Sequence, residues 1–413
     1  MDNEGLRKRT GETTQEKPDV RAAAVGEAEH PHPGGEVKHG LPVQILRAIG
    51  SIGWALISLI GIHITQFTGA PLYFWNKDYY YAWMALTKQH FVIILITVSQ
   101  LFSPTVIRIS WDPSMRGQLR KTPDGRLETS FPERIILMSN HQIYTDWIYL
   151  WWSAYTSRMH GHLVVLLKES LRYIPLLGPG MMFYGFIFMA RKWASDKPRL
   201  AHRLQQLKTK HTLLESGSTE LDPMWLLIFP EGTNLSANTR KKSVAWSQKS
   251  GKPDMKHQLL PRATGMHFCL QQLKGTVDWV YDCTVAYEGV PPNGYAQDYF
   301  SLRSTFLQGR PPKSVNLHWR RFAVADIPLD SSESFQTWIE TRWREKDAML
   351  DQYKNTGRFP ADTDTEDAKT PAYVETDVRL KSWTELLQPY VTPLTVFLLF
   401  NIVRRFWKQF ISG

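Results

Sequence analysis

A histidine and an aspartate stand five positions apart in the segment Ser-Asn-His-Gln-Ile-Tyr-Thr-Asp, as His141 and Asp146. The segment directly follows residues 135–139, which have the apolar character of a buried strand. In α/β folds, chemistry is placed on side chains that leave the carboxyl ends of parallel strands. An aspartate in the first turn of the next helix could accept one imidazole N–H and leave the other nitrogen free to take a proton. The pair is a candidate general base and its orienting acid, although in isolation a loop histidine and a helix-terminal acid are the better explanation.

A second polar segment, Phe-Pro-Glu-Gly-Thr at 229–233, follows the apolar run 225–229. Proline ends a strand ladder, and Gly232 permits a positive φ or a close backbone approach. Glu231 and Thr233 offer polar contacts. An ordinary strand exit explains the proline and the glycine but not the whole pentapeptide.

A third segment, Gly-Phe-Ile-Phe-Met-Ala-Arg at 185–191, is an apolar run that ends in Arg191. A guanidinium at a strand end can hold a phosphate through two parallel hydrogen bonds. The alternative is an arginine whose head group extends from an apolar surface into water.

Taken together, these segments resemble the glycerolipid acyltransferase family, typified by 1-acylglycerol-3-phosphate acyltransferases. The family's N-H-x4-D motif is matched by Asn140, His141 and Asp146, and its G-x-[IV]-F-x-x-R motif by residues 185–191. Its F-P-E-G-T motif is matched at 229–233, and its apolar-proline pair by Leu260–Pro261. The four motifs occur in the family's order within residues 105–290.

The resemblance implies that His141 acts as the base on the acceptor hydroxyl, that Asp146 orients it, and that Arg191 binds the acceptor's phosphate. It implies further substrate contacts from Asn140, Lys168, Glu231, Gly232 and Thr233. Candidates for the phosphates of acyl-CoA are Arg240, Lys241, Lys242 and Arg262, with a solvated basic face as the alternative. Acyl-CoA would be a co-substrate, and neither a cofactor nor a metal is expected.

The third motif continues as Asn234–Leu235–Ser236, and Leu-Leu-Pro-Arg-Ala-Thr-Gly follows at 259–265. These segments resemble the eukaryotic branch that includes lysocardiolipin and lysophosphatidylinositol acyltransferases. The expected reaction is acyl-CoA-dependent acylation of a lysophospholipid hydroxyl, on lysophosphatidic acid, lysophosphatidylinositol or lysocardiolipin. The alternatives are a CoA-independent transacylase, a glycerol-3-phosphate acyltransferase and a non-catalytic lipid-binding scaffold.

The predicted fold is α/β, with a mainly parallel sheet flanked by helices, N-terminal membrane-embedded helices and a C-terminal helical extension. Short apolar runs predict strands over 105–111, 135–139, 162–168, 225–229 and 277–286. Helices are expected over 146–155, 197–215 and 334–353, the last of them amphipathic.

Three runs lack Asp, Glu, Lys and Arg: 48–76, 89–107 and 386–403. The first is long enough to cross a bilayer, whereas Pro104 makes a short embedded helix as plausible as a full span for the second. The third precedes Arg404 and Arg405 and could anchor the C-terminus. Buried helices of a soluble protein are the alternative.

The predicted organisation is a disordered tail over 1–40, a membrane-embedded helical region over 41–104 and an acyltransferase domain over 105–290. An extension carrying the amphipathic helix follows over 291–380, with a polar linker at 355–378. A candidate membrane anchor covers 381–413.

The formal net charge of +10 suits an anionic membrane surface or anionic substrates, and no nucleic-acid-binding signature accompanies it. Cys269 and Cys283 form no spaced motif, which favours a reducing compartment. No apolar segment follows the first charged residues as in a signal peptide. The expected location is the endoplasmic reticulum membrane, with the outer mitochondrial membrane or lipid droplets as alternatives.

Overall fold

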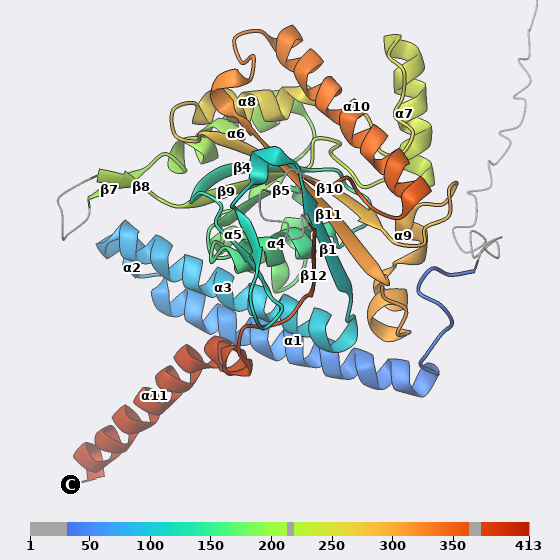
Figure 1. The fold of residues 1–413 in the computed structure, drawn as a ribbon. Helices are drawn as coiled ribbons and strands as arrows, with labels where there is room; N and C mark the ends of the chain where they lie inside the picture. Colours follow the sequence, from blue (N-terminus) through green and yellow to red (C-terminus); the bar gives the residue numbers. More distant parts are fainter. Residues whose placement is uncertain (1–30, 213–218, 363–372, 413) are drawn as a thin grey trace, which may run out of the picture. The chain divides into compact units, whose positions relative to one another are not determined.

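An eight-stranded sheet with the order β12-β1-β11-β10-β4-β9-β5-β6 organises the computed structural model (Figure 1). The structure describes residues 31–212, 219–362 and 373–412, so residues 1–30 of the predicted tail lie outside it. The strands of this sheet are β1 (Val106–Trp111), β4 (Arg134–Ser139), β5 (Leu163–Lys168), β6 (Ile187–Met189), β9 (Met224–Ile228), β10 (Trp279–Tyr287), β11 (Ser314–Ala323) and β12 (Tyr373–Asp377).

Five neighbouring strands, β10, β4, β9, β5 and β6, run parallel to one another. β11 is antiparallel to β10 and parallel to β1, and β12 is antiparallel to β1. The predicted mainly parallel α/β sheet is therefore confirmed. Because the five parallel strands share one direction, their carboxyl ends meet at one edge of the sheet.

Helices cover both faces of the sheet, and the alternation of side chains along β4 shows how. Ile135 and Leu137 face a core shared with α1, α3 and α4, whereas Ile136 and Met138 face a core shared with α6, α8 and α10. Figure 1 shows α6, α8 and α10 on one side and α1 and α3 on the other. The bounds are α1 (Leu41–Gly69), α3 (Lys77–Phe102), α4 (Asp146–Thr156), α6 (Trp193–Gln206), α8 (Ala263–Leu273) and α10 (Ser332–Thr356).

The predicted amphipathic helix is α10. The Ser331 side chain caps its start by accepting the Ser334 N–H, and Gly357 ends it with a left-handed backbone at φ 74°. Phe335, Ile339 and Trp343, spaced by four residues, are fully buried against the sheet. Burial of this stripe fixes the helix against the sheet.

Two segments differ from the expectation. The helix predicted over 197–215 ends at Gln206, and Lys210–Thr212 (β7) instead pairs antiparallel with Thr219–Leu221 (β8). The predicted linker 355–378 is also partly regular structure: α10 continues to Thr356, and Tyr373–Asp377 form the edge strand β12. Residues 363–372 lie outside the described residues. Polar composition hid β12, because one of its two buried residues is Thr376 and only Val374 is apolar.

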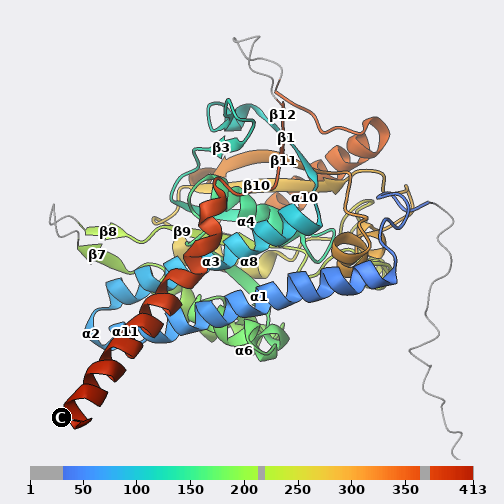
Figure 2. The ribbon, with the colours of Figure 1, turned by 90° about the horizontal axis from the view of Figure 1, so that it is seen from below.

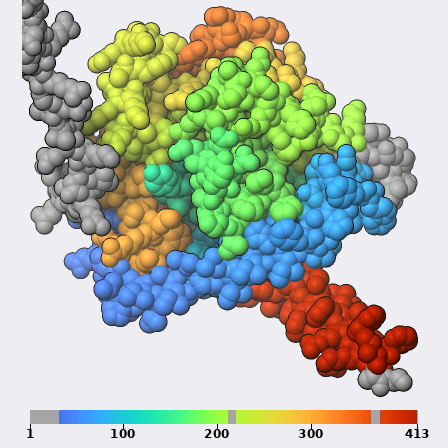
Figure 3. Space-filling model, turned by 180° about the vertical axis from the view of Figure 1, so that it is seen from behind, coloured from blue at the N-terminus to red at the C-terminus, as the bar shows by residue number. Residues whose placement is uncertain are grey.

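Three helical segments are long and apolar enough to cross a membrane: Leu41–Trp75, Lys77–Phe102 and Trp383–Ile411. The second is a full-length helix because it ends before Pro104. The first two lie along the sheet (Figure 2), whereas α11 (Gln388–Ser412) stands clear of it (Figure 3). These segments indicate a membrane protein.

Candidate active site

The loops that follow β4, β9, β5 and β6 meet at the carboxyl edge of the sheet. His141, Glu231 and Arg191 lie in the loops after β4, β9 and β6, and Lys168 is the last residue of β5. Side chains from segments up to ninety positions apart are thereby brought to one place, as the strand pattern predicted.

His141 and Asp146 are in contact. Nδ1 of His141 lies 2.8 Å from Oδ2 of Asp146, and that oxygen also accepts the N–H groups of Gln142 at 2.6 Å and Ile143 at 3.0 Å. Asp146 is the first residue of α4 and its carboxylate is fully buried, so it folds back onto the loop that carries the histidine. The carboxylate makes Nδ1 the donor, which leaves Nε2 as the basic nitrogen. The imidazole remains 17% exposed, enough for a substrate to reach it.

The F-P-E-G-T loop supports the histidine from the other side. The ring of Phe229 stacks on the imidazole, with centroids 4.3 Å apart and an interplanar angle of 24°. The N–H of Leu235 donates to the His141 carbonyl at 2.7 Å. Both contacts restrain His141, the first at the face of its ring and the second at its backbone carbonyl.

Glu231 ties three of the motifs together. Its Oε1 accepts the His141 N–H at 3.0 Å and its Oε2 accepts the Leu259 N–H at 3.2 Å, next to the Leu260–Pro261 pair. The side chain is buried, and this burial raises the pKa of Glu231 to about 8. Glu231 therefore lies behind the catalytic loop, and its surroundings fit a positioning role better than the predicted contact with substrate.

Asn140 is likewise turned inward. It is fully buried, its Nδ2 donates to the Val285 carbonyl at 3.0 Å, and its Oδ1 accepts the Val285 N–H at 2.8 Å. These two bonds attach the catalytic loop to β10. As with Glu231, the geometry points to positioning in place of the predicted substrate contact.

Arg191 and Arg262 flank Gly232. Nη2 of Arg191 donates to the Gly232 carbonyl at 2.7 Å, and the Arg262 guanidinium carbon lies 3.8 Å from where a Cβ on Gly232 would stand. The space beside Gly232 would admit a Cβ, but its φ of 72° favours glycine there. Burial, and then the charge of Arg262, lower the pKa of Arg191. Within residues 31–212, 219–362 and 373–412, neither guanidinium has a carboxylate partner, so the positive charge of both is available to an anionic group.

Asp196 holds the Arg191 loop, and the sequence analysis missed it. It is buried in the first turn of α6 and accepts the N–H groups of Ala190 at 2.8 Å and Lys192 at 3.0 Å. Arg191 between them has a left-handed φ of 64°, which these bonds stabilise. A signal was present: Asp196 follows Arg191 by five residues, the spacing of His141 and Asp146.

A second residue missed is Tyr287, at the end of β10. Its hydroxyl donates to Oδ1 of Asp146. The two residues are separated by 141 positions, and no local pattern around Tyr287 marks it.

The remaining predicted residues differ in their solvent exposure and in their bonds to other residues. Lys168 is exposed at the end of β5 and Thr233 is half-buried in its loop. Arg240, on α7 (Ala237–Ser250), bonds to Asp254 at 3.2 Å and to the Met255 carbonyl at 2.7 Å, which commits it to holding a loop and disfavours the predicted acyl-CoA contact. Its neighbours Lys241 and Lys242 are exposed on the same helix.

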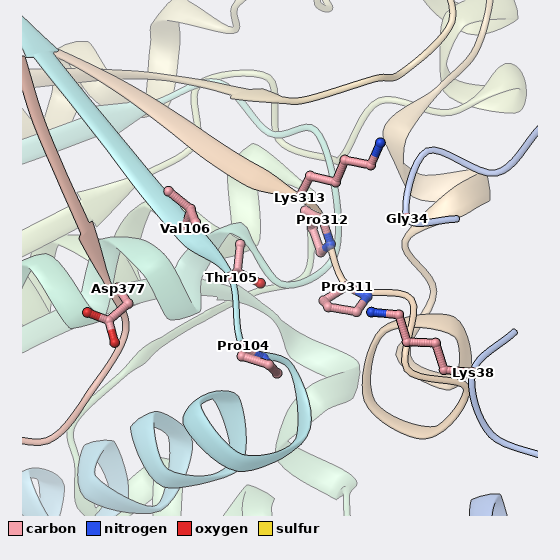
Figure 4. Close-up of a pocket in the computed structure, with 9 residues that line it drawn as sticks. All are labelled: Gly34, Lys38, Pro104, Thr105, Val106, Pro311, Pro312, Lys313 and Asp377. Atoms are coloured by element: carbon pink, nitrogen blue, oxygen red, sulfur yellow. The ribbon is translucent and has the colours of Figure 1, made fainter. Parts of the chain in front are cut away.

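A separate cavity of about 350 Å³ opens at the same sheet edge, beside the start of β1 (Figure 4). Thr105, Val106 and Asp377 line one side, and Lys38 and Lys313 the other. None of the predicted site residues lines this cavity. In the described part of the chain, no group of three or more His, Cys, Asp or Glu side chains converges as metal ligands would.

Comparison with known proteins identifies the family of the chain. The sequence matches the family described as Acyltransferase over residues 124–288 and the one described as Acyltransferase C-terminus over 305–384. An uncharacterized acyltransferase of Schizosaccharomyces pombe is 35% identical over 86% of this chain and 95% of its own. The 2-acyl-1-lysophosphatidylinositol acyltransferase of Saccharomyces cerevisiae is 38% identical over 70% of this chain and 79% of its own. Lysocardiolipin acyltransferase 1 of Danio rerio is 32% identical over 54% of this chain and 53% of its own.

The first two relatives cover more than two thirds of this chain, and both matched family regions fall where the four motifs and the amphipathic helix lie. The chain therefore belongs to the glycerolipid acyltransferase family, within its eukaryotic lysophospholipid branch, and is an O-acyltransferase.

Proposed function

We propose that this protein transfers a fatty acyl group from acyl-CoA to a free hydroxyl of a lysophospholipid, with His141 as the general base. The observation that carries the proposal is the 2.8 Å contact between Nδ1 of His141, whose side chain is 17% exposed, and the buried carboxylate of Asp146. The names of two relatives, acyltransferases of lysophosphatidylinositol and of lysocardiolipin, support the class of acceptor.

In the proposed reaction, Nε2 of His141 removes the proton of the acceptor hydroxyl as its oxygen attacks the thioester carbonyl carbon. Asp146 stabilises the imidazolium that forms. The C–S bond then breaks, the ester is complete, and the CoA thiolate recovers the proton from the imidazolium. The acceptor hydroxyl takes the place that a serine holds in hydrolases, so no acyl-enzyme is required.

The pair Arg191 and Arg262 would bind the phosphate that all three candidate acceptors carry. Guanidinium groups suit this task because each presents two parallel N–H donors to phosphate oxygens. Arg262 was predicted to contact acyl-CoA and is assigned here to the acceptor because it lies beside Gly232 with Arg191. Lys241 and Lys242, exposed on α7, are then the remaining candidates for the phosphates of acyl-CoA. The apolar helices α1 and α3 would keep the reaction at a membrane surface, where both lipid substrates partition. The endoplasmic reticulum stays a prediction, to be tested by tagging the full chain.

The test is a transfer assay on the purified full-length protein in detergent. Radiolabelled oleoyl-CoA is offered with lysophosphatidic acid, lysophosphatidylinositol or lysocardiolipin in parallel, with His141→Ala as the blank. We expect ester formation with at least one acceptor, none without acyl-CoA, and none in the variant. Near-normal turnover in folded His141→Ala protein would exclude the mechanism. Transfer from a phospholipid donor without acyl-CoA would instead identify a transacylase.

A further inference from the structure

The second carboxylate oxygen of Asp146 has a partner of its own. Oδ2 takes the three N–H donors of the catalytic loop, whereas Oδ1 points the other way, to the hydroxyl of Tyr287. Asp146 is fully buried and Tyr287 is 4% exposed, so water does not replace this donor. We propose that Tyr287 is a positioning residue that keeps the Asp146 carboxylate oriented toward His141 and stabilises its negative charge. The proposal rests on the proposed function, because it needs His141 to act as the base.

The ring of Tyr287 is held firmly enough for this task. It packs against Phe300, with centroids 5.7 Å apart, and edge-on against Tyr149 at 6.4 Å. Tyr287 is the last residue of β10, and Val285 of the same strand is bonded twice to Asn140. The strand therefore fixes both ends of the loop, at Asn140 directly and at Asp146 through the phenol.

The expected effect of Tyr287 on His141 follows from the number of hydrogen bonds that the Asp146 carboxylate accepts. A carboxylate that lacks a donor on one oxygen binds a neighbouring proton more strongly, because its charge is less well stabilised. Without the phenol, the Asp146 carboxylate would attract the proton of the imidazolium form of His141 more strongly. Burial, with the adjacent charge of Asp146, raises the pKa of Tyr287, so the phenol keeps the proton that it donates.

Other ionisable groups also surround the dyad of His141 and Asp146, and their titration must be distinguished from the effect of Tyr287 on the pH profile. Around Asp146, Tyr287 and Glu231 these groups are Tyr149 on α4, Cys283 on β10 and Lys346 on α10. Tyr287→Phe removes one hydroxyl and leaves all of these groups in place. A change in the pH profile is then assigned to the lost hydrogen bond.

The experiment compares Tyr287→Phe with Tyr281→Phe in the acyl-CoA-dependent assay across pH. Tyr281 is the matched control: it lies on the same strand and in the same core, is fully buried, and bonds through its hydroxyl to Gln118, at the far end of β10. We expect the acid limb of kcat/KM in Tyr287→Phe to move upward by about half a pH unit to one unit. The loss of activity should therefore be several-fold to about tenfold below neutral pH and should shrink as pH rises.

A pH profile of Tyr287→Phe that coincides with that of Tyr281→Phe would overturn the proposal and leave Tyr287 with a structural role only. If Tyr287→Phe does not fold, Tyr287→3,5-difluorotyrosine keeps the hydroxyl and makes it a stronger donor. The acid limb should then move toward lower pH, and an unmoved limb refutes the proposal equally. Activity in His141→Ala would instead refute the proposed function, so the two failures are distinguishable.

Discussion

Replacing Asp146 with asparagine isolates the charge of the dyad from its geometry. In Asp146→Asn, the amide oxygen can take the place of Oδ2 and accept the same three N–H groups. The amide N–H₂ can take the place of Oδ1 and donate to the hydroxyl oxygen of Tyr287. The backbone N–H groups of Gln142 and Ile143 select this orientation, because each requires an acceptor. No hydrogen bond is lost, so the variant should fold like the wild-type protein.

The missing negative charge should nonetheless cost most of the activity. With Nδ1 and Oδ2 2.8 Å apart, the charge centres of imidazolium and carboxylate are separated by about 4 Å, which corresponds to about 4 kcal/mol at an effective dielectric constant near 20. The dyad acquires this interaction only when His141 takes up the proton. We therefore expect kcat to fall about a thousandfold with little change in either KM.

The assay measures kcat and both KM values in detergent, together with the thermal unfolding midpoint. Asp196→Asn is the matched control, because Asp196 is equally buried and also sits in the first turn of a helix. Its two oxygens accept separate N–H groups around Arg191, so the control should raise the KM for the acceptor more than it lowers kcat. A stable Asp146→Asn enzyme within tenfold of wild-type kcat would refute the reasoning that the carboxylate charge stabilises the transition state.

Three further changes give separate readouts. Arg191→Lys should raise the acceptor KM about tenfold, because a point charge cannot replace the guanidinium fork; an unchanged KM would speak against phosphate binding there. Glu231→Gln should lower kcat and leave one of two main-chain N–H groups unpaired. The folded state raises the pKa of Glu231 from 4.5 to about 8 and so favours its protonated form. The free energy of unfolding of the wild-type protein should therefore fall as pH rises between those values. Melting curves from about pH 5 to 9 should show a smaller decline in Glu231→Gln. The double change Lys241→Ala and Lys242→Ala should raise the KM for acyl-CoA without altering the melting temperature. Arg240→Ala should instead lower the melting temperature, because it loses the bonds to Asp254 and Met255. A higher KM for acyl-CoA in Arg240→Ala with an unchanged KM in the double variant would assign the acyl-CoA contact to Arg240.

Sequence reasoning reached the strands β4, β5 and β9 because each is a short apolar run, buried on both faces of the sheet. It reached His141, Asp146 and Arg191 because their motifs lie at the ends of such runs. It did not anticipate that Asn140 and Glu231 face inward, since a polar side chain in a loop gives no local indication of which backbone groups it will meet. The missing information in both cases is tertiary: the partners are Val285 and Leu259, which lie far along the chain.

The strands that escaped prediction explain why residues 291–380 cannot be treated as an appendix to the catalytic region. β11 lies between β1 and β10 and was hidden by the polar residues Asn316, His318 and Arg320, which are buried but bonded to other side chains. Lys346 on α10 is fully buried, bonds to Asp282, and donates to the Cys283 carbonyl at 2.8 Å.

Cys283 pairs in register with Ser139, the residue before Asn140. The second matched family region therefore contacts β10, and β10 is the sheet neighbour of β4, the strand that precedes His141. Its removal would expose the edge of β10 and leave the charge of Asp282 buried without its partners, each of which is strongly unfavourable. Because of this arrangement, the sheet that positions His141 is built from both matched regions of the chain.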